Sequence, residues 1–205
     1  MMHPPHSNFR DQRRIRIIEV AKSVFYESGY AAATMSQISE RLGGSKATLY
    51  AYFKNKSELF AAIISEQCDS MLPLFKVHGG NERLADILNH IGRHIMVMVM
   101  SDRWVRTTQL VIEEAKSSPE LASLMHETMQ SQSKAQMIDL LKKSHEKGEV
   151  YIDDFDEASD VLAGLMMGKI YLERLLSVRP EPSMDDISRH VARAVTMFMT
   201  YYAPK

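Results

Sequence analysis

The stretch TMSQISERLGGSKATLYAYFKNK, which runs from Thr34 to Lys56, contains two short helical patterns separated by a pair of glycines. Thr34 and Gln37 have the spacing of a capping box, so a helix should begin at this threonine. Apolar residues follow at helical spacing until Gly43 and Gly44, and glycine readily adopts the left-handed backbone of a helix exit. The stretch therefore predicts a helix that ends in a tight turn.

A second short helix is predicted directly after the turn, capped by Ser45 and running to about Phe53. Its inward residues should be Ala47, Leu49 and Phe53, and its outward donors Lys46, Thr48, Tyr50 and Tyr52. Hydroxyls, an ammonium and phenol groups on one helix suit the second helix of a helix-turn-helix unit, which enters the major groove of DNA. Two ordinary core helices with a glycine turn are the alternative that this spacing leaves open.

A longer pattern surrounds this stretch. It reads Arg14-x-x-Ile17-Ile18-x-x-Ala21-x-x-x-Phe25-x-x-x-Gly29-Tyr30, then Thr34, Ile38, Leu42-Gly43, Thr48-Leu49-Tyr50-x-Tyr52-Phe53, Lys56 and Leu59-Phe60. This pattern, within residues 1–65, resembles the TetR family of transcriptional regulators, and the C-terminal half looks like the AefR-type members. Gly44 departs from the family pattern, in which a β-branched residue is more common.

The resemblance implies an all-α chain, with an N-terminal three-helix helix-turn-helix DNA-binding domain and a larger helical domain for ligand binding and dimerisation. We expect a disordered tail at residues 1–9, the DNA-binding domain at 10–55, a connecting helix at 56–78 and the larger domain at 79–205. The implied base-edge contacts are Lys46, Thr48 and Tyr50. The implied phosphate contacts are Thr34, Ser36, Ser45, Tyr52 and Lys56.

The distribution of charge along the chain favours nucleic acid as a partner. Residues 1–60 hold nine Lys and Arg against five Asp and Glu, whereas the whole chain has a net charge of −1. A basic N-terminal part on an acidic body suits a protein that presents one face to DNA. The single cysteine, Cys68, has no intramolecular disulfide partner. Because no signal peptide or membrane-length apolar run is present, we expect a cytoplasmic protein with no membrane partner.

The remaining sequence has helical periodicity throughout. We expect helices at about 10–28, 34–42, 45–53, 56–75, 81–101, 103–117, 119–147, 155–178 and 184–203, with Gly29 ending the first. The segment Val97–Val99 favours a strand by propensity alone, but its flanks are helical, so we assign it to a helix. No phosphate-binding glycine loop, zinc-spaced cysteine pair or long repeat occurs.

The last two predicted helices carry apolar stripes that suit either the chain's own core or a partner. The resemblance favours a dimer interface built from two copies of this helix pair, and a two-fold dimer reads a palindromic operator in double-stranded DNA. The predicted interface residues are Val161, Gly164, Leu165, Gly168, Leu172, Val191, Val195, Phe198 and Tyr202.

The middle helices are rich in methionine, which adapts its shape to irregular apolar ligands. Because the family places an effector pocket in this part of the chain, we expect a small-molecule site there, although any one of these residues also suits a plain core. The predicted lining is His94, Met96, Met100, Trp104, Gln109, His126, Met129 and Met137.

Together these observations favour a dimeric transcriptional repressor that a small apolar or amphipathic ligand releases from its operator. No cofactor, metal or catalytic residue is expected. Three alternatives stay open: an activator or corepressor-dependent regulator, a helical ligand-binding or scaffold protein with a vestigial helix-turn-helix, and a metal-dependent hydrolase. The hydrolase would use His90 and His94, which are four residues apart but lack the glutamate of the zinc-protease pattern.

Overall fold

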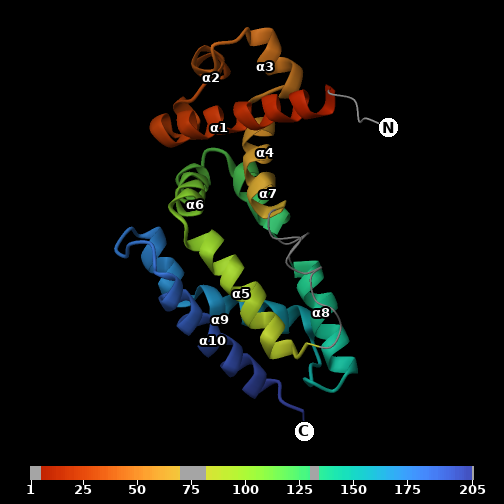
Figure 1. Ribbon diagram of the computed structural model, residues 1–205. Helices are drawn as coiled ribbons and strands as arrows, with labels where there is room; N and C mark the ends of the chain where they lie inside the picture. Colours follow the sequence, from red (N-terminus) through yellow and green to blue (C-terminus); the bar gives the residue numbers. More distant parts are fainter. Residues whose placement is uncertain (1–5, 70–81, 130–133, 205) are drawn as a thin grey trace. The chain divides into compact units, whose positions relative to one another are not determined.

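The computed structural model describes residues 6–69, 82–129 and 134–204, and of residues 6–9, 67–69 and 129 it describes the backbone alone (Figure 1). These ranges contain ten helices and no strand, which confirms the all-α prediction. The helices are α1 (His6–Ala32), α2 (Met35–Leu42), α3 (Lys46–Tyr52), α4 (Lys56–Asp69), α5 (Leu84–Met100), α6 (Asp102–Glu114), α7 (Pro119–Met129), α8 (Ala135–Glu146), α9 (Phe155–Leu175) and α10 (Met184–Tyr201).

The chain divides into two compact units. The first is Met1–Glu66 together with Leu110–His126, and the second is Gln67–Gln109 together with Glu127–Lys205. The segment Leu110–His126 therefore belongs to the same unit as the helix-turn-helix. The sequence instead predicted that everything from residue 79 onward forms the larger domain. None of the helices in the described ranges is both long and apolar enough to cross a bilayer.

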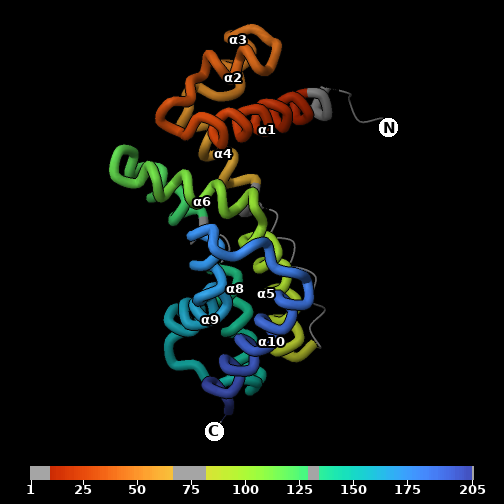
Figure 2. The backbone as a smooth tube through the Cα atoms, turned by 90° about the vertical axis from the view of Figure 1, so that its left-hand side faces the viewer, coloured from red at the N-terminus to blue at the C-terminus, as the bar shows by residue number. Residues whose placement is uncertain are grey.

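The first unit packs α1 against α2, and α2 against α3, as the backbone in Figure 2 shows. Its centre is an aromatic cluster in which the ring centroids of Phe25, Tyr30 and Phe60 lie 5.2–5.5 Å apart. Ile38 of α2 and Leu49 of α3 are 0% and 1% exposed, so both short helices are anchored by buried apolar side chains. Burial of such a side chain contributes roughly 1.5–3 kcal/mol each, which short helices need because they are marginal alone.

A buried lysine joins α1 to α4 in this unit. Lys22 is 2% exposed, and its Nζ lies 2.8 Å from Glu19 Oε1 and 2.6 Å from Glu66 Oε2. Burial, and then the neighbouring Glu19, raise the pKa of the Glu66 carboxyl. The ammonium is thus held by two carboxylates, which offsets the cost of removing it from water.

The first helix differs from its predicted bounds at both ends. It begins at His6, so the tail assigned to residues 1–9 contains helical backbone from that residue on, while residues 1–5 lie outside the described part. Gly29 does not end the helix but kinks it, with φ 77° and ψ 160°, and helical backbone continues to Ala32. Glycine adopts this backbone at little cost, which is why the turn occurs there.

The second unit is a bundle of α5, α8, α9 and α10. The helix α10 packs along α5 and buries Ile187, Val191, Ala194, Val195 and Phe198. A Cβ atom on Gly92 of α5 would lie 2.6 Å from Met166 Cε and 2.9 Å from Val191 Cγ1. Glycine at this position therefore allows α5, α9 and α10 to approach one another closely.

The other predicted helices are found close to their expected ranges, with some corrections. The single helix expected at 119–147 is described as two elements, α7 and α8, because residues 130–133 lie outside the description. The predicted end of the connecting helix, residues 70–75, also lies outside it. The segment Val97–Val99 is helical, as predicted, within α5. Finally, α9 has a kink at Gly168, where φ is 42°.

Candidate DNA-contact surface and effector body

Side chains cap both helices of the helix-turn-helix. Thr34 Oγ1 accepts from Gln37 N at 3.2 Å, and Gln37 Oε1 accepts from Thr34 N at 2.8 Å, so the predicted capping box is present. At the exit of α2, Gly43 has the left-handed φ of 65°. Ser45 Oγ then accepts from Thr48 N at 3.2 Å and caps α3. These local bonds fix where each helix begins and ends.

The outward face of α3 consists of Lys46, Ala47, Tyr50 and Ala51, which are all exposed. Tyr50 is 49% exposed although it is a large aromatic residue. The sequence placed Ala47 on the inward face, and this assignment is wrong because only Leu49 and the C-cap Phe53 are buried. A seven-residue helix packs along one narrow line, so positions 46, 47, 50 and 51 turn away from it together.

Most of the DNA contacts predicted beside the exposed face of α3 have partners within the chain or are partly buried. Thr34 and Ser45 serve as caps, and Ser36 is half-buried. Thr48 Oγ1 lies 3.0 Å from Ser45 Oγ, and the guanidinium carbon of Arg10 is 6.0 Å from the centroid of the Tyr52 ring. The Thr34 hydroxyl also donates to Gln37 Oε1 at 3.1 Å, so a phosphate oxygen has to compete with that acceptor for its proton. The phosphate role of Thr34, Ser36, Ser45 and Tyr52 stays a prediction, as does the base-edge role of Thr48.

Lys56, at the start of α4, has an intramolecular role that the sequence did not indicate. Its Nζ donates to Tyr30 O at 2.6 Å and to Ala31 O at 3.2 Å, and it lies 4.2 Å from the centroid of the Tyr30 ring. Burial lowers the pKa of this amine, and the nearby Glu114 carboxylate opposes that shift. Because an ammonium has three donors, one is left for the phosphate contact predicted for this residue.

Tyr30 and Ala31 lie in the last turn of α1, where backbone carbonyl groups have no acceptor role within the helix. The N–H group of Ala31 donates to Glu114 Oε1 at 3.0 Å, so the end of α6 is tied to the same two residues that Lys56 holds. This junction lies entirely within the first unit. It links the start of α4 to the last residue of α6, and both helices also contribute residues to the second unit.

The residues predicted to bind an effector are divided between the two units. Met96, Met100 and Trp104 are buried, His94 and His126 are exposed, and Gln109 and Met137 are half-buried. His126 belongs to the first unit and the others to the second, while the side chain of Met129 lies outside the description. The effector role of these residues therefore stays a prediction.

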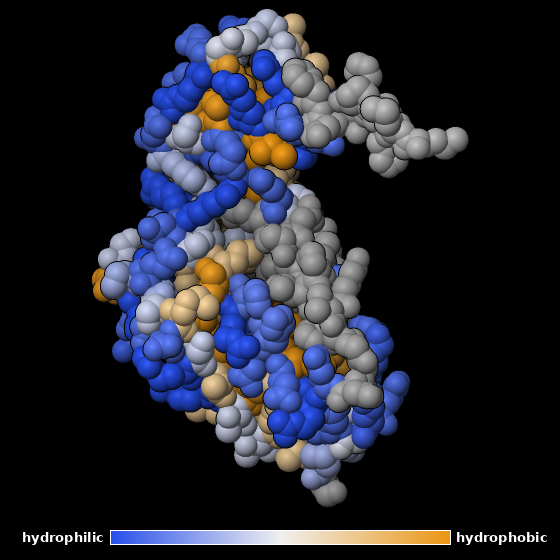
Figure 3. Space-filling view, in the orientation of Figure 1, coloured by the Kyte–Doolittle hydropathy of each residue, from blue (hydrophilic) through white to orange (hydrophobic). Residues whose placement is uncertain are grey.

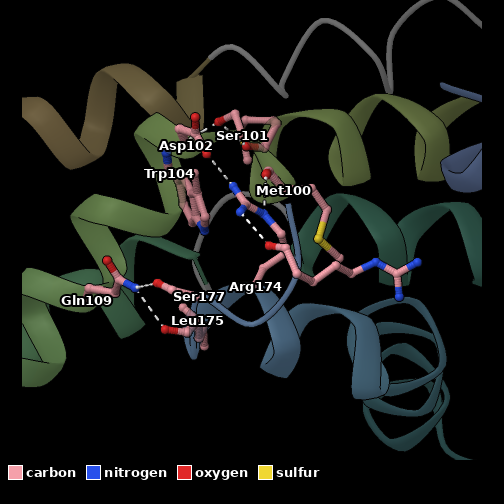
Figure 4. Close-up of polar contacts among 10 residues, drawn as sticks. Met100, Ser101, Asp102, Trp104, Gln109, Arg174, Leu175 and Ser177 are labelled. Carbon is pink, nitrogen blue, oxygen red and sulfur yellow. Dashed lines mark hydrogen bonds and ion pairs between the residues drawn. The ribbon is translucent and has the colours of Figure 1, made fainter. Parts of the chain in front are cut away.

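Trp104 is part of a satisfied polar network at the start of α6. Its Nε1 donates to Tyr171 Oη at 3.1 Å, and Thr108 Oγ1 lies 3.2 Å from the same oxygen. Gln109 Nε2 donates to Leu175 O at 2.8 Å and to Ser177 Oγ at 3.2 Å (Figure 4). These bonds hold α6 against the C-terminal end of α9, so an apolar ligand that enters here has to displace them.

Arg174, on α9, binds both the last residue of α5 and the first residue of α6. It is 6% exposed, and its guanidinium donates to Met100 O at 3.1 Å, Arg179 O at 2.9 Å and Asp102 Oδ1 at 2.6 Å (Figure 4). Met100 is the last residue of α5, whose terminal carbonyl has no partner within its own helix. Sequence reasoning missed this residue, because a lone arginine in a helix gives no signal of burial.

A hollow of about 540 Å³ lies between α9 and α10, and it contains none of the predicted effector residues. Its lining is Lys169, Ile170, Glu173, Arg179, Asp186, Arg189, His190, Ala192 and Arg193. Glu173 pairs with Arg179 at 2.9 Å and Lys169 at 3.3 Å, and these bonds lower the pKa of its carboxyl. Asp186 pairs with Arg189 at 2.7 Å. Four cationic side chains therefore accompany two carboxylates in this lining, which leaves the hollow with a net positive charge.

The predicted dimer residues divide between core and surface. Val191, Val195 and Phe198 are 0–2% exposed in the chain's own core, so their assignment to an interface is corrected. The stripe that they form faces α5, as the alternative reading of the sequence allowed. Gly164, Gly168 and Leu172 are exposed, whereas Val161, Leu165 and Tyr202 are half-buried.

Additional exposed apolar residues accompany these on α9, α10 and the intervening loop. They are Leu176, Val178, Met184, Met197 and Tyr201, each 58–78% exposed. The space-filling view likewise shows apolar residues among hydrophilic ones on the visible face of the second unit (Figure 3). Exposed apolar residues that gather on neighbouring helices are typical of an interaction surface.

Among the described residues, the histidine pair of α5 is not part of a larger set of metal ligands. The rings of His90 and His94 are 4.5 Å apart, and His94 Nδ1 lies 2.9 Å from His90 O. Within residues 6–69, 82–129 and 134–204, no group of three or more His, Cys, Asp or Glu side chains is placed to hold a metal ion.

Two protein-family models match this chain, each over a different part. Residues 17–63 match the model for bacterial regulatory proteins of the tetR family, and residues 86–204 match the C-terminal domain of AefR-like transcriptional repressors. The second match alone covers more than half of the chain. The chain belongs to the TetR family. Its relatives in this family are transcriptional regulators with a DNA-binding helix-turn-helix, so the chain is a regulator and not an enzyme.

Individual TetR-family proteins resemble either part of the chain or all of it. The transcriptional activator FasR of Mycolicibacterium smegmatis is 40% identical over 63 residues, which are 31% of this chain and 29% of FasR. A TetR-family regulator from Mesorhizobium loti superposes with a TM-score of 0.82 at 21% identity, covering 94% of this chain and 98% of its own. The flavonoid-responsive regulator FrrA superposes with a TM-score of 0.79 at 25% identity, covering 95% and 99%.

Proposed function

We propose that this TetR-family regulator is a cytoplasmic dimeric repressor that binds a palindromic operator and leaves it when a small apolar or amphipathic ligand binds. The observation that carries the DNA-binding part is the exposed face of α3. Lys46, Ala47 and Tyr50 point outward from a helix whose opposite side is buried and whose start is capped. A methyl, an ammonium and a phenol are groups that read base edges in the major groove.

The dimer is supported by the exposed glycines and apolar residues of α9 and α10. Gly164 has no other atom within 4 Å of the place where its Cβ would lie, so a second helix can approach closely there. Leu172 and Tyr201 are 55% and 78% exposed, and such side chains gain from burial against a partner. A two-fold dimer of this helix pair presents two recognition helices to two half-sites.

Ligand release is supported by the buried, methionine-containing core around α5 and α6 and by the family. FrrA, which covers nearly all of this chain, is named for its response to flavonoids. A ligand that enters near Trp104 breaks its bond to Tyr171 and moves the start of α6. Because α6 ends at Glu114, beside Ala31 and Lys56, this helix and α4 carry the change to the DNA-binding helices. Release requires that the ligand binds the two states with different affinity.

The first experiment is a selection of fragmented genomic DNA on the purified protein at moderate salt, followed by sequencing. Enrichment of a few palindromic sites is the expected result. Lys46→Ala and Tyr50→Phe should then weaken operator binding by roughly 1–3 kcal/mol each and relax the preference at one base position. Arg93→Ala, which removes a cation from α5 of the second unit, is the matched control and should leave operator binding unchanged.

Uniform recovery of all fragments would contradict the operator and favour a scaffold with a vestigial helix-turn-helix. An activator is the second candidate, because FasR is described as one. Transcription in vitro from an enriched promoter separates the two: a repressor lowers the transcript level and ligand restores it, whereas an activator raises it.

A further inference from the structure

The turn between α2 and α3 contains a glycine that the backbone itself does not require. Gly43 has a left-handed φ, but Gly44, the next residue, is not among the residues with positive φ. A Cβ atom on Gly44 would instead lie 3.0 Å from Nη2 of Arg13, which comes from α1. The missing side chain therefore makes room for a guanidinium.

Arg13 has no neutralising partner among the side chains that the structure describes. Its side chain is half-buried, and in the part of the chain that the structure describes it has no ion pair or hydrogen bond. Together with Ser45 and Thr48 it borders a small void of about 10 Å³ beside Gly44. A guanidinium has five N–H donors, so a half-buried one without an acceptor is suited to an anion from outside the chain.

We propose that Arg13 is a phosphate-contacting residue of the DNA interface, and that Gly44 positions it. The proposal rests on the operator binding proposed above and adds a residue of α1 to it. Ser45 and Thr48, which share the void with Arg13, adjoin the outward face of α3. When that face enters the major groove, the DNA backbone runs along its flanks, and arginine binds phosphate oxygens with two parallel bonds.

This proposal gives a role to Gly44, which departs from the β-branched residue more common in the family. A β-branched residue at position 44 places its Cβ 3.0 Å from Nη2 and two further atoms beside it, so the guanidinium has to move away. With glycine at position 44, the guanidinium of Arg13 occupies the space beside the turn that an apolar side chain would take. Arg10 and Arg14, one turn before and one residue after Arg13, lie against the aromatic rings of Tyr52 and Phe53 at 6.0 Å and 5.5 Å.

The test measures DNA affinity by fluorescence anisotropy over a range of salt concentrations, with an operator duplex and an unrelated duplex. Arg13→Gln removes the charge and leaves a shorter polar side chain. It should lower the slope of log affinity against log salt by about 0.9 for each protomer bound, and weaken both duplexes about fivefold per protomer at physiological salt. Arg13→Lys, which keeps the charge, should retain most of the slope. Arg93→Gln is the control for net charge.

Gly44→Val tests the positioning. With Arg13 present, it should displace the guanidinium and reproduce the loss of slope and affinity seen for Arg13→Gln. In the Arg13→Gln background the same substitution should cause no further loss. Circular dichroism checks that each variant is folded, and a folded Gly44→Val protein with an unchanged salt slope would overturn the positioning role.

The outcomes separate this inference from the proposed function. If the natural protein prefers an operator and Arg13→Gln keeps its affinity and salt slope, Arg13 is not a phosphate contact although the repressor function stands. If the protein binds all duplexes alike and Arg13→Gln lowers the slope, the phosphate contact stands without an operator. Absence of any DNA binding by the natural protein would overturn both.

Discussion

The helix-turn-helix and the C-terminal bundle are held by polar contacts of very different sequence separation. In the former, Thr34 bonds with Gln37 and Ser45 with Thr48, in each case three residues apart. In the latter, Trp104 bonds with Tyr171, 67 residues away, and Arg174 with Met100, 74 residues away. The DNA-contact surface is thus specified locally, whereas the interior of the body depends on contacts that form only when distant segments meet.

This difference suits the two tasks proposed for the molecule. A surface that reads DNA needs side chains in fixed positions. Short-range caps set where its two helices begin, and the buried side chains of Ile38 and Leu49 anchor these helices in the unit. A body that responds to a ligand needs contacts that ligand binding can break together. The long-range hydrogen bonds at the start of α6 are close to one another and can be broken in this way. The predictions below test how far the two regions are independent.

The largest effect is expected for Trp104→Ala. The side chain is 1% exposed, so its loss should lower the free energy of unfolding of the second unit by about 4 kcal/mol. Hydrogen exchange should show faster exchange in the second unit, while amides of α2 and α3 keep their protection. Val97→Ala, at a residue 37% exposed on α5, is the control and should change stability by less than about 0.5 kcal/mol. Equal loosening of both units would contradict their independence.

Arg174→Met should have the next largest effect, a loss of about 2–3 kcal/mol. The substitution fills a similar volume but leaves the buried carbonyl groups of Met100 and Arg179 without their donor. Asp102 contributes less, because its side chain is 85% exposed and returns to water. Urea denaturation gives the free energy of unfolding of Arg174→Met and of the control Arg93→Met. Similar values for the two variants would show that Arg174 does not stabilise the connection between α5 and α6.

Two glycine substitutions should act in opposite directions. Gly92→Ala inserts a methyl against Met166 and Val191, and overpacking should exceed the gain in helix propensity and destabilise the chain by about 1 kcal/mol. Gly164→Ala meets no atom and should stabilise the protomer by about 0.5–1 kcal/mol. Thermal unfolding gives both values. Analytical ultracentrifugation should show a weaker dimer for Gly164→Ala, and an unchanged dimer would argue against close helix approach there.

The smallest effect is expected for the local cap. Thr34→Ala removes the acceptor for Gln37 N and should cost about 1 kcal/mol of stability in the first unit. Ser123→Ala, at an exposed position inside α7, should be neutral or slightly stabilising because alanine is the better helix former. Chemical denaturation measures both, and loss of the second unit's structure in Thr34→Ala would show that the two regions are coupled more tightly than their contacts indicate.

Local chemistry explains which parts of the site the sequence could predict. The capping box at Thr34, the exit at Gly43 and the cap at Ser45 each depend on residues within one helical turn, and all three are present. The inward assignment of Ala47 was wrong because apolar character alone does not determine which side of a short helix is buried. The sequence counted Arg13 only among the nine basic residues of the N-terminal part, since its place beside Gly44 depends on the packing of α1 against the turn.

The fold of the body was predictable in class but not in detail. Helical periodicity gave its helices, yet the same stripe of Val191, Val195 and Phe198 suits a partner or the chain's own α5, and only the packed structure decides between them. The burial of Arg174 was hidden for a related reason. Its partners are two carbonyl groups and one carboxylate from other segments, and a backbone carbonyl carries no sequence signal.

The bonds at the kink of α1 have a consequence for how this family of sequences can diverge. Glu114 accepts from the N–H group of Ala31, and Lys56 donates to the carbonyl groups of Tyr30 and Ala31. Every non-proline residue offers the same main-chain groups, so position 31 can accept many substitutions without loss of the junction. Positions 56 and 114 supply the side chains and cannot. Evolutionary drift is therefore permitted on one side of this junction and restricted on the other.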